Sequence, residues 1–308
     1  MIILAAVDLS SASVDAARTA LTLARRLGDE LLLVHAVEPL PGVPSAAPVV
    51  PGQPPDHHTH AANLEALKNL RASLQADDVG VELRIVEGRP YDALMACAEQ
   101  CKPRMLVMGS HGRRAVARLL LGSVTQKVLL ASHHPVLIMR QGTAPLAAWG
   151  ERPLRIIAGI DRGPTGAAIL RWLEPLRAAG PTEVTLLHEF WPAREQARLA
   201  TPSTGETAAV SSAASGTTTS EGDVAALLER ELRDQLRQQG VTDEFQLRVC
   251  AVQGPISEQL GIDAQAEAAD LLVITNPHGP GASTSVWGST AAATMSATRI
   301  PLLVLPVG

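Results

Sequence analysis

Four small residues in the first half of the chain have types and a spacing suited to holding a phosphate group. Gly109 and Gly112 come directly after the apolar run 105–108, which has the composition of a buried strand. Nine residues further on, Gly122 and Ser123 open an apolar-periodic segment. Glycine at a strand's carboxyl end lets the backbone turn and approach a ligand, and the N–H groups of a helix N-terminus attract anions. The pattern predicts a phosphate cradle, and it is not a Walker loop because the chain contains no Gly-Lys-Ser/Thr.

Further candidate ligand contacts lie at the ends of neighbouring predicted strands. Val7 and Asp8 end the first apolar run, and Ala36 lies near the end of the second. Met108 and His111 flank the first glycine of the cradle. Because the carboxyl ends of parallel strands share one edge of a sheet, we expect Asp8, Ala36 and Gly109 to meet in one crevice. His111 is the histidine best placed to contact a phosphate, whereas Asp8 could instead serve only as a helix cap.

The elements that must position these residues alternate between short apolar strands and helices. In the first half we expect strands at 2–7, 30–37, 82–87, 105–108 and 136–140, and helices at 13–27, 60–77, 91–101 and 119–131. That alternation is typical of an α/β fold with a doubly wound, parallel sheet.

The second half of the chain repeats the first. Asp8 and His35 recur 153 residues later, as Asp161 and His188. Further along the chain the offset becomes 166 residues: the counterparts of Gly88, Gly122 and Pro135 are Gly254, Gly288 and Pro301. The difference of 13 residues falls in an interval that holds the Ser/Thr/Ala/Gly-rich run 200–222, which we interpret as a disordered loop. We therefore expect one domain at 1–141, a linker at 142–152 and a second domain at 153–308.

Composition excludes several classes of protein. A hydrophobic content of 46% with 19% charged residues is that of a soluble globular protein, and a net charge of −5 argues against a nucleic-acid partner. The chain has no apolar run long enough for a membrane span and no charged leader before the first strand, so we expect a cytoplasmic protein.

The cysteines and most histidines have ordinary structural interpretations. Cys97 and Cys101 lie one turn apart on a helix without evident further ligands, and Cys250 lies in a strand-like run, so we expect buried thiols and no metal. The apolar strand around His35 favours a structural role in the core for this histidine. We also interpret His133 and His134, which precede a strand, as structural. The His57-His58-x-His60 cluster lies in a Pro-rich loop, where a solvated loop is favoured over a metal site.

These residues together resemble the universal stress protein family in its tandem two-domain form. The family's motif G-2x-G-9x-G-(S/T) is met in full in the first half. The family's strand-end Asp matches Asp8, its second-strand His and following apolar residue match His35 and Ala36, and its closing His/Cys-Pro-Val-Leu matches residues 134–137. Its Gly-x-Pro matches Gly88 and Pro90.

The resemblance implies two Rossmann-like or flavodoxin-like domains, each with a five-stranded, mostly parallel sheet, that bind ATP or AMP, with Mg²⁺ if ATP. It places Asp8 and Ala36 on the adenine and ribose side, and Met108 and Gly109 along the ribose. The phosphate contacts are then Gly112, Gly122, Ser123 and Val124. It also implies pairing of domains through the last strand, here either between the two halves or with a second chain.

Two departures from the family pattern stand out in the first half. Ala36 is smaller than the Val that ATP-binding members often carry. Arg104 takes the place of an Asp that the second half keeps as Asp270.

The corresponding cradle of the second half is damaged. Its motif reads Asn276-Pro277-His278-Gly279, followed by eight residues and Gly288-Ser289. We interpret Asn276 as the replacement of the first glycine, and Pro277 removes a backbone donor. The basic residues Arg113, Arg114 and Arg118 of the first half, which could either reach phosphates or solvate a helix, have no counterparts there. We expect one nucleotide per chain.

The leading interpretation is a stress or signalling protein in which ATP or AMP changes domain packing or the choice of an unknown protein partner. No Ser/His/Asp order, motif-placed carboxylate pair or metal signature indicates an enzyme, although arginines with Mg²⁺ would allow slow ATP hydrolysis. The alternative is a scaffold of the same family that binds no nucleotide and acts through protein contacts. A third class, enzymes that cleave ATP between its α and β phosphates, needs a Gly-rich loop after the first strand, and residues 8–13 contain no glycine.

Overall fold

The computed structural model describes residues 1–38, 60–111, 121–140, 142–143, 146, 149–200, 220–241, 245–277 and 293–307. The first half of the chain contains β1 (Ile2–Ala6), α1 (Ser11–Leu27), β2 (Glu30–Val37), α2 (His60–Leu74), β3 (Val81–Glu87), α3 (Pro90–Cys101), β4 (Met105–Gly109), α4 (Ser123–Ala131) and β5 (Val136–Met139). The second half contains β6 (Leu154–Gly159), α5 (Thr165–Ala179), β7 (Thr182–Phe190), α6 (Pro192–Ala200), α7 (Glu221–Gln238), β8 (Gln246–Ala251), α8 (Ile256–Ala266), β9 (Leu271–Pro277) and β10 (Leu302–Val307).

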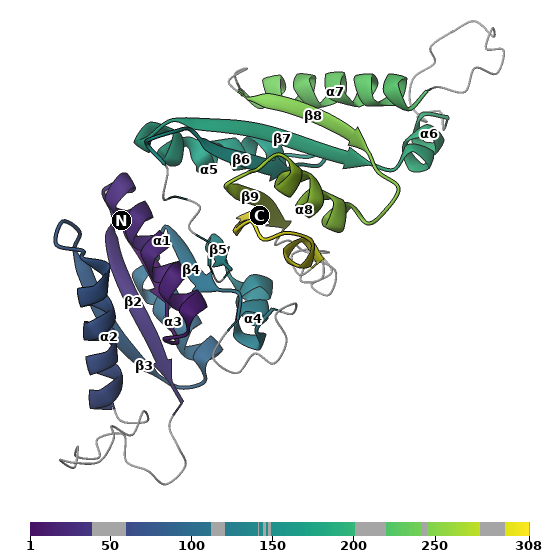
Figure 1. Ribbon diagram of the computed structural model, residues 1–308. Helices are drawn as coiled ribbons and strands as arrows, with labels where there is room; N and C mark the ends of the chain where they lie inside the picture. Colours follow the sequence, from purple (N-terminus) through teal and green to yellow (C-terminus); the bar gives the residue numbers. More distant parts are fainter. Residues whose placement is uncertain are drawn as a thin grey trace, which may run out of the picture.

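The strands form one ten-stranded sheet in the order β3-β2-β1-β4-β5-β10-β9-β6-β7-β8. Within each half the strands are parallel, as the alternating pattern predicts. The equivalent strands of the second half follow in the reverse order across the sheet. The two halves join where β5 and β10 pair antiparallel, with Leu303 opposite Leu137. In Figure 1 the purple-to-blue half and the green half lie on either side of this junction. The last strand of each half is therefore an interior strand of the combined sheet.

Helices cover both faces of the sheet, which buries every interior strand on two sides. One core cluster takes apolar residues from α1, α2, α5 and α7, and the other takes them from α3, α4 and α8.

The ends of α1 are determined by local sequence signals. The Ser10 hydroxyl caps α1 by accepting from the Ser13 amide, and Gly28 ends the helix in the left-handed region with φ 67°. The start therefore lies at Ser11, two residues before the predicted one.

The segment between the halves is bound to both of them. Trp149 is buried, and its indole Nε1 donates to the Pro181 carbonyl at 3.2 Å. The Arg26 guanidinium of α1 lies 5.6 Å from the centre of the Trp149 ring and donates to the Trp149 carbonyl. These contacts restrain the halves beyond the β5–β10 pairing.

The described residues contain no helix that is long and apolar enough to cross a membrane. Nor do they contain a cluster of three or more His, Cys, Asp or Glu side chains suited to a metal ion. His57 and His58 lie outside the described residues, whereas His60 begins α2.

Candidate functional site

Three strand ends of the first half converge at the point where the strand order changes direction. Residue Ala6 of β1 lies opposite Val34 of β2 on one side and opposite Met108 of β4 on the other. The residues that follow, Asp8 and Gly109 among them, therefore share the carboxyl edge of the sheet. Strands β2 and β3 extend to one side of this point and β4 and β5 to the other, which makes it the switch point where α/β sheets bind ligands.

The loop after β1 is held by Asp8. Its Oδ1 accepts hydrogen bonds from the Ser10 amide at 3.0 Å and the Ser10 hydroxyl at 2.6 Å, and its own amide donates to Ser13 Oγ at 3.2 Å. Leu9, between them, takes a positive φ of 64°. The helix cap is thus Ser10 and not Asp8, because the Asp8 carboxylate turns back to fix the loop that carries the cap.

Gly109 has a structural role in addition to any contact with a ligand. A Cβ at this position would lie 3.1 Å from both the carbonyl carbon and the Cβ of Ala12, and 3.1 Å from the Ser13 amide nitrogen. The glycine therefore lets the first turn of α1 pack directly on the end of β4. The sequence pattern assigns this glycine to the turn after the strand and to ligand approach, and the packing of α1 is a further reason for it.

The start of α4 carries the backbone donors that the sequence pattern predicts for a phosphate cradle. Gly122 is the N-cap, with an extended ψ of 147°, and its amide donates to the Ser110 carbonyl at 2.8 Å. The helix starts at Ser123, later than the predicted residue 119. Within the described part of the chain the amides of Ser123 and Val124 have no hydrogen-bond acceptor, and the Ser123 side chain is exposed. Two backbone donors and a hydroxyl are thus available to an anion at this helix end.

The other predicted contacts differ in accessibility. His111 is half-buried, with Nδ1 2.8 Å from the Ser110 hydroxyl, and Ala36 is half-buried at the end of β2. Val7 and Met108 are buried, so their side chains belong to the core. Gly112, Arg113, Arg114 and Arg118 lie outside the described residues.

His35 is a core residue, as its apolar strand predicts. Its Nδ1 lies 2.6 Å from the Val7 carbonyl. The second half contains the same contact, because His188 Nδ1 lies 2.9 Å from the Ile160 carbonyl, and both pairs are separated by 28 residues. The repeat thus extends to individual hydrogen bonds.

The strand register corrects the interpretation of Asn276. Gly109 lies opposite Met139 on β5, and Thr275 lies opposite Leu305 on β10, both offset by 166 residues. Thr275 therefore takes the place of Gly109, and Asn276 lies one residue later. Asn276 is buried, and its Nδ2 donates to the Leu129 carbonyl of the first half at 2.9 Å, so it joins the halves. Gly279, Gly288 and Ser289 lie outside the described residues.

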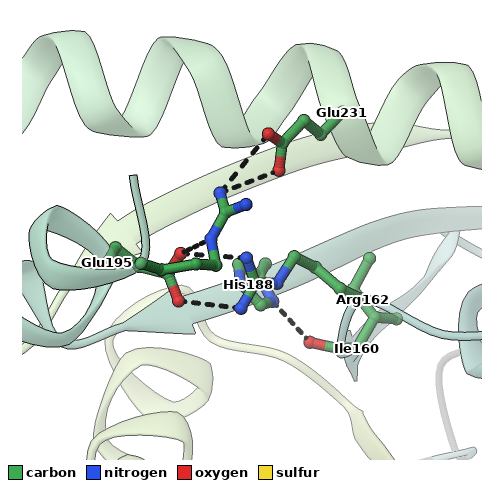
Figure 2. Close-up of polar contacts among 6 residues, drawn as sticks. Ile160, Arg162, His188, Glu195 and Glu231 are labelled. Carbon is green, nitrogen blue, oxygen red and sulfur yellow. Dashed lines mark hydrogen bonds and ion pairs between the residues drawn. The ribbon is translucent and has the colours of Figure 1, made fainter. Parts of the chain in front are cut away.

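At the strand ends of the second half, charged side chains stand where the first half has apolar ones. Arg162, which follows Asp161, takes the place of Leu9, and Glu189 takes the place of Ala36. Arg162 forms a bidentate ion pair with Glu195 of α6, shown in Figure 2 beside His188. These three charged residues are absent from the predicted site.

Comparison with known proteins accounts for this architecture. The family model of the universal stress proteins matches residues 1–140. A universal stress protein of Thermus aquaticus is 36% identical over 141 residues, which cover 45% of this chain and 97% of that protein. The chain belongs to the universal stress protein family. A universal stress protein of Methanocaldococcus jannaschii is 28% identical over 136 residues, covering 44% of this chain and 78% of the relative.

A solved universal stress protein from Archaeoglobus fulgidus shares the fold of the whole chain, with a TM-score of 0.66 at 16% identity. The superposition covers 100% of this chain and 98% of the Archaeoglobus fulgidus chain. The family model, in contrast, matches residues in the first half alone. The charged residues of the second half have one signal in the sequence: Glu189 lies at the repeat position of the site residue Ala36, and Arg162 follows Asp161, the counterpart of Asp8.

Proposed function

We propose that the first half of the chain binds an adenine nucleotide, ATP or AMP, at the carboxyl edge of β1, β2 and β4. The observation that carries this proposal is the N-terminus of α4, where the Ser123 and Val124 amides lack acceptors among the described residues and lie beside the switch point of the sheet. Backbone donors and the positive end of a helix dipole suit a phosphate group. Membership of the universal stress protein family and the complete glycine motif support the same assignment.

Each residue of this proposed site has a distinct role. Asp8 and Ala36 border the base and ribose, where the carboxylate of Asp8 also holds the Ser10 loop. Val7, Met108 and Gly109 contribute through their backbone at the strand ends. The phosphate contacts are His111 and the motif residues Gly112, Gly122, Ser123 and Val124. ATP would bring Mg²⁺ with it, which would neutralise part of the phosphate charge.

We further propose two domains, at 1–141 and 153–308 with the linker at 142–152, and one nucleotide per chain. The half that holds the nucleotide site also contributes β5 to the β5–β10 junction, so binding can act on domain packing or on a surface that a protein partner recognises. The function is ligand binding and not turnover. A scaffold that binds no nucleotide is the alternative.

The decisive experiment is mass spectrometry of the small molecules released when freshly purified protein is denatured. We expect about one ATP or AMP per chain. No release, together with no calorimetric binding of millimolar ATP and Mg²⁺, would contradict the proposal and favour the scaffold.

The variant Ser123→Asp separates binding from folding. Its carboxylate repels a phosphate but interacts favourably with the positive end of α4, worth about 0.3–1 kcal/mol. We expect nucleotide affinity to fall at least tenfold with no loss of thermal stability. Ser123→Ala is the matched control, because it keeps the backbone amide, and it should retain most of the affinity. Equal nucleotide affinity in the unsubstituted protein, Ser123→Asp and Ser123→Ala would show that the phosphate does not bind at the start of α4.

A further inference from the structure

The charged cluster of the second half occupies the position that corresponds to the nucleotide crevice of the first. Arg162 lies in the loop after β6, and β6 is the counterpart of β1 in the strand order. Helix α6 follows β7 directly and carries Glu195 back toward this loop (Figure 2). Arg198, one turn later on the same helix, contacts Glu195. The carboxyl edge of β6 and β7 is thus covered by the chain itself.

The Glu195 carboxylate is held as a bound anion would be. Arg162 donates from Nη1 and Nη2 to its two oxygens, both at 2.9 Å, and Arg198 Nε donates to Oε2 at 2.7 Å. The Glu195 side chain is only 6% exposed, whereas those of Arg162 and Arg198 are 33% and 37% exposed. A guanidinium fork with a second guanidinium beside it matches the geometry of phosphate oxygens as well as that of a carboxylate.

The groups around this carboxylate leave the two arginines available to an anion. Asp161 is engaged locally, because its Oδ1 accepts from the Thr165 hydroxyl at 2.6 Å. Glu231 of α7 contacts Arg198 from the outer side, with oxygens at 3.1 and 3.3 Å from Nη2. Burial, reinforced by the charge of Arg162, lowers the pKa of His188, so the imidazole adds no positive charge at neutral pH. Glu195 is therefore the principal anion that faces both guanidinium groups.

Helix α6 is attached mainly by this ion network. Glu195 is its one buried residue, so the helix has no buried apolar side chain against the core. The residue before it, Trp191, is anchored separately, because its Nε1 donates to the Gly254 carbonyl at 2.8 Å. Release of Glu195 would therefore free α6 at little hydrophobic cost while its start stays in place.

We propose that Arg162 and Arg198 form an anion site in the second half, that Glu195 occupies it as an internal ligand, and that a small phosphate-bearing anion displaces Glu195. The site differs from the proposed nucleotide site, because its donors are side chains and its occupant belongs to the chain. Displacement would release α6 and couple the anion to the exposed surface around α6 and α7.

The test uses inorganic pyrophosphate as the probe, titrated calorimetrically into the full chain carrying Ser123→Asp, which suppresses binding at α4. Glu195→Ala should bind pyrophosphate at least tenfold more tightly than the parent, because the internal competitor is gone. Adding Arg162→Ala should abolish that gain. Glu231→Gln is the matched control, since it removes one acidic charge from the same network but not the internal ligand, and it should change affinity by less than threefold.

Two results would overturn the proposal: no gain in affinity for Glu195→Ala, or a gain that persists when Arg162 is also replaced. Glu195→Gln, which keeps the side-chain volume, serves in the same way if the alanine variant does not fold. Hydrogen exchange provides a second readout in the protein without substitutions. Saturating pyrophosphate should lower amide protection in residues 192–200 at least tenfold, and unchanged protection there would contradict displacement. Loss of the nucleotide site alone would leave all these outcomes in the second half unaffected.

Discussion

The two halves of this universal stress protein share a backbone frame but differ in the chemistry at the ends of their strands. Both halves have the same strand order and the same hydrogen bond from a strand histidine to a neighbouring carbonyl. At the crevice, however, the residues differ: the counterpart of Leu9 in the second half is Arg162, and the counterpart of Ala36 is Glu189. The first half exposes backbone donors to a ligand, and the second fills the equivalent space with its own charges.

This difference teaches that the frame and the site depend on different residues. Interior apolar residues and the His–carbonyl bonds position the strands. The loop and strand-end residues can therefore differ between the halves, with the proposed nucleotide site in one and an ion-paired set in the other, without a change of fold. The predictions below test this separation.

The largest effect is expected from Glu189, the residue in the second half that replaces Ala36. It is buried, and within the described residues no donor group contacts its carboxylate oxygens. Burial, with Asp263 beside it, raises the pKa of Glu189 to about 8 from 4.5. The folded state therefore holds a proton that the unfolded state releases above pH 4.5. This contribution to stability is complete below pH 4.5 and is lost as the pH rises to about 8, at roughly 1 kcal/mol per pH unit.

Urea unfolding at pH 6, 7 and 8 measures this loss. Glu189→Gln, which stays neutral at every pH, should remove most of the decline. Glu174→Gln is the matched control on an exposed position of α5, and it should leave the decline unchanged. A decline of the same steepness in Glu189→Gln would show that another group causes it.

Much of the frame was predictable from the sequence, because local patterns carry it. The alternation of apolar runs and helices, the repeat landmarks and the glycine motif predict the α/β fold of both halves. The helix start at Ser11 was missed by two residues, since Ser10 and Ser13 are both good caps and only the hydrogen bond decides. The place of Asn276 was wrong by one residue, because a motif alignment cannot see the β-strand register.

The charged site of the second half could not be predicted in the same way. Arg162 and Glu195 are 33 residues apart and meet only because α6 folds back over the end of β6. Likewise, the contact of Gly109 with Ala12 depends on how α1 packs on β4, and neither residue reports it alone. Local sequence indicates which residues are suited to chemistry, whereas tertiary packing decides which of them meet.

The next effect in size concerns the packing of α1 on β4. In Gly109→Ala the new Cβ would lie 3.1 Å from backbone atoms of Ala12 and Ser13, which cannot rotate away. We expect a loss of about 1–3 kcal/mol in the free energy of unfolding, the usual cost of overpacking. Thr275→Ala is the counterpart in the second half, where a side chain is already accommodated, and it should cost less than about 1 kcal/mol. Equal losses in the two variants would show that the halves pack alike at this point.

The smallest difference is expected where the halves agree. His35→Leu and His188→Leu each remove one hydrogen bond to a buried strand-end carbonyl, of Val7 and Ile160 respectively. Each change leaves that carbonyl without its partner and should cost about 1–3 kcal/mol. Urea unfolding at pH 8 should give losses for the two variants within about 0.5 kcal/mol of each other, and their sum in the double variant, because the sites are far apart. A much larger loss for His188→Leu would mean that this histidine also supports the Arg162–Glu195 pair, and the shared frame would then extend into the charged site.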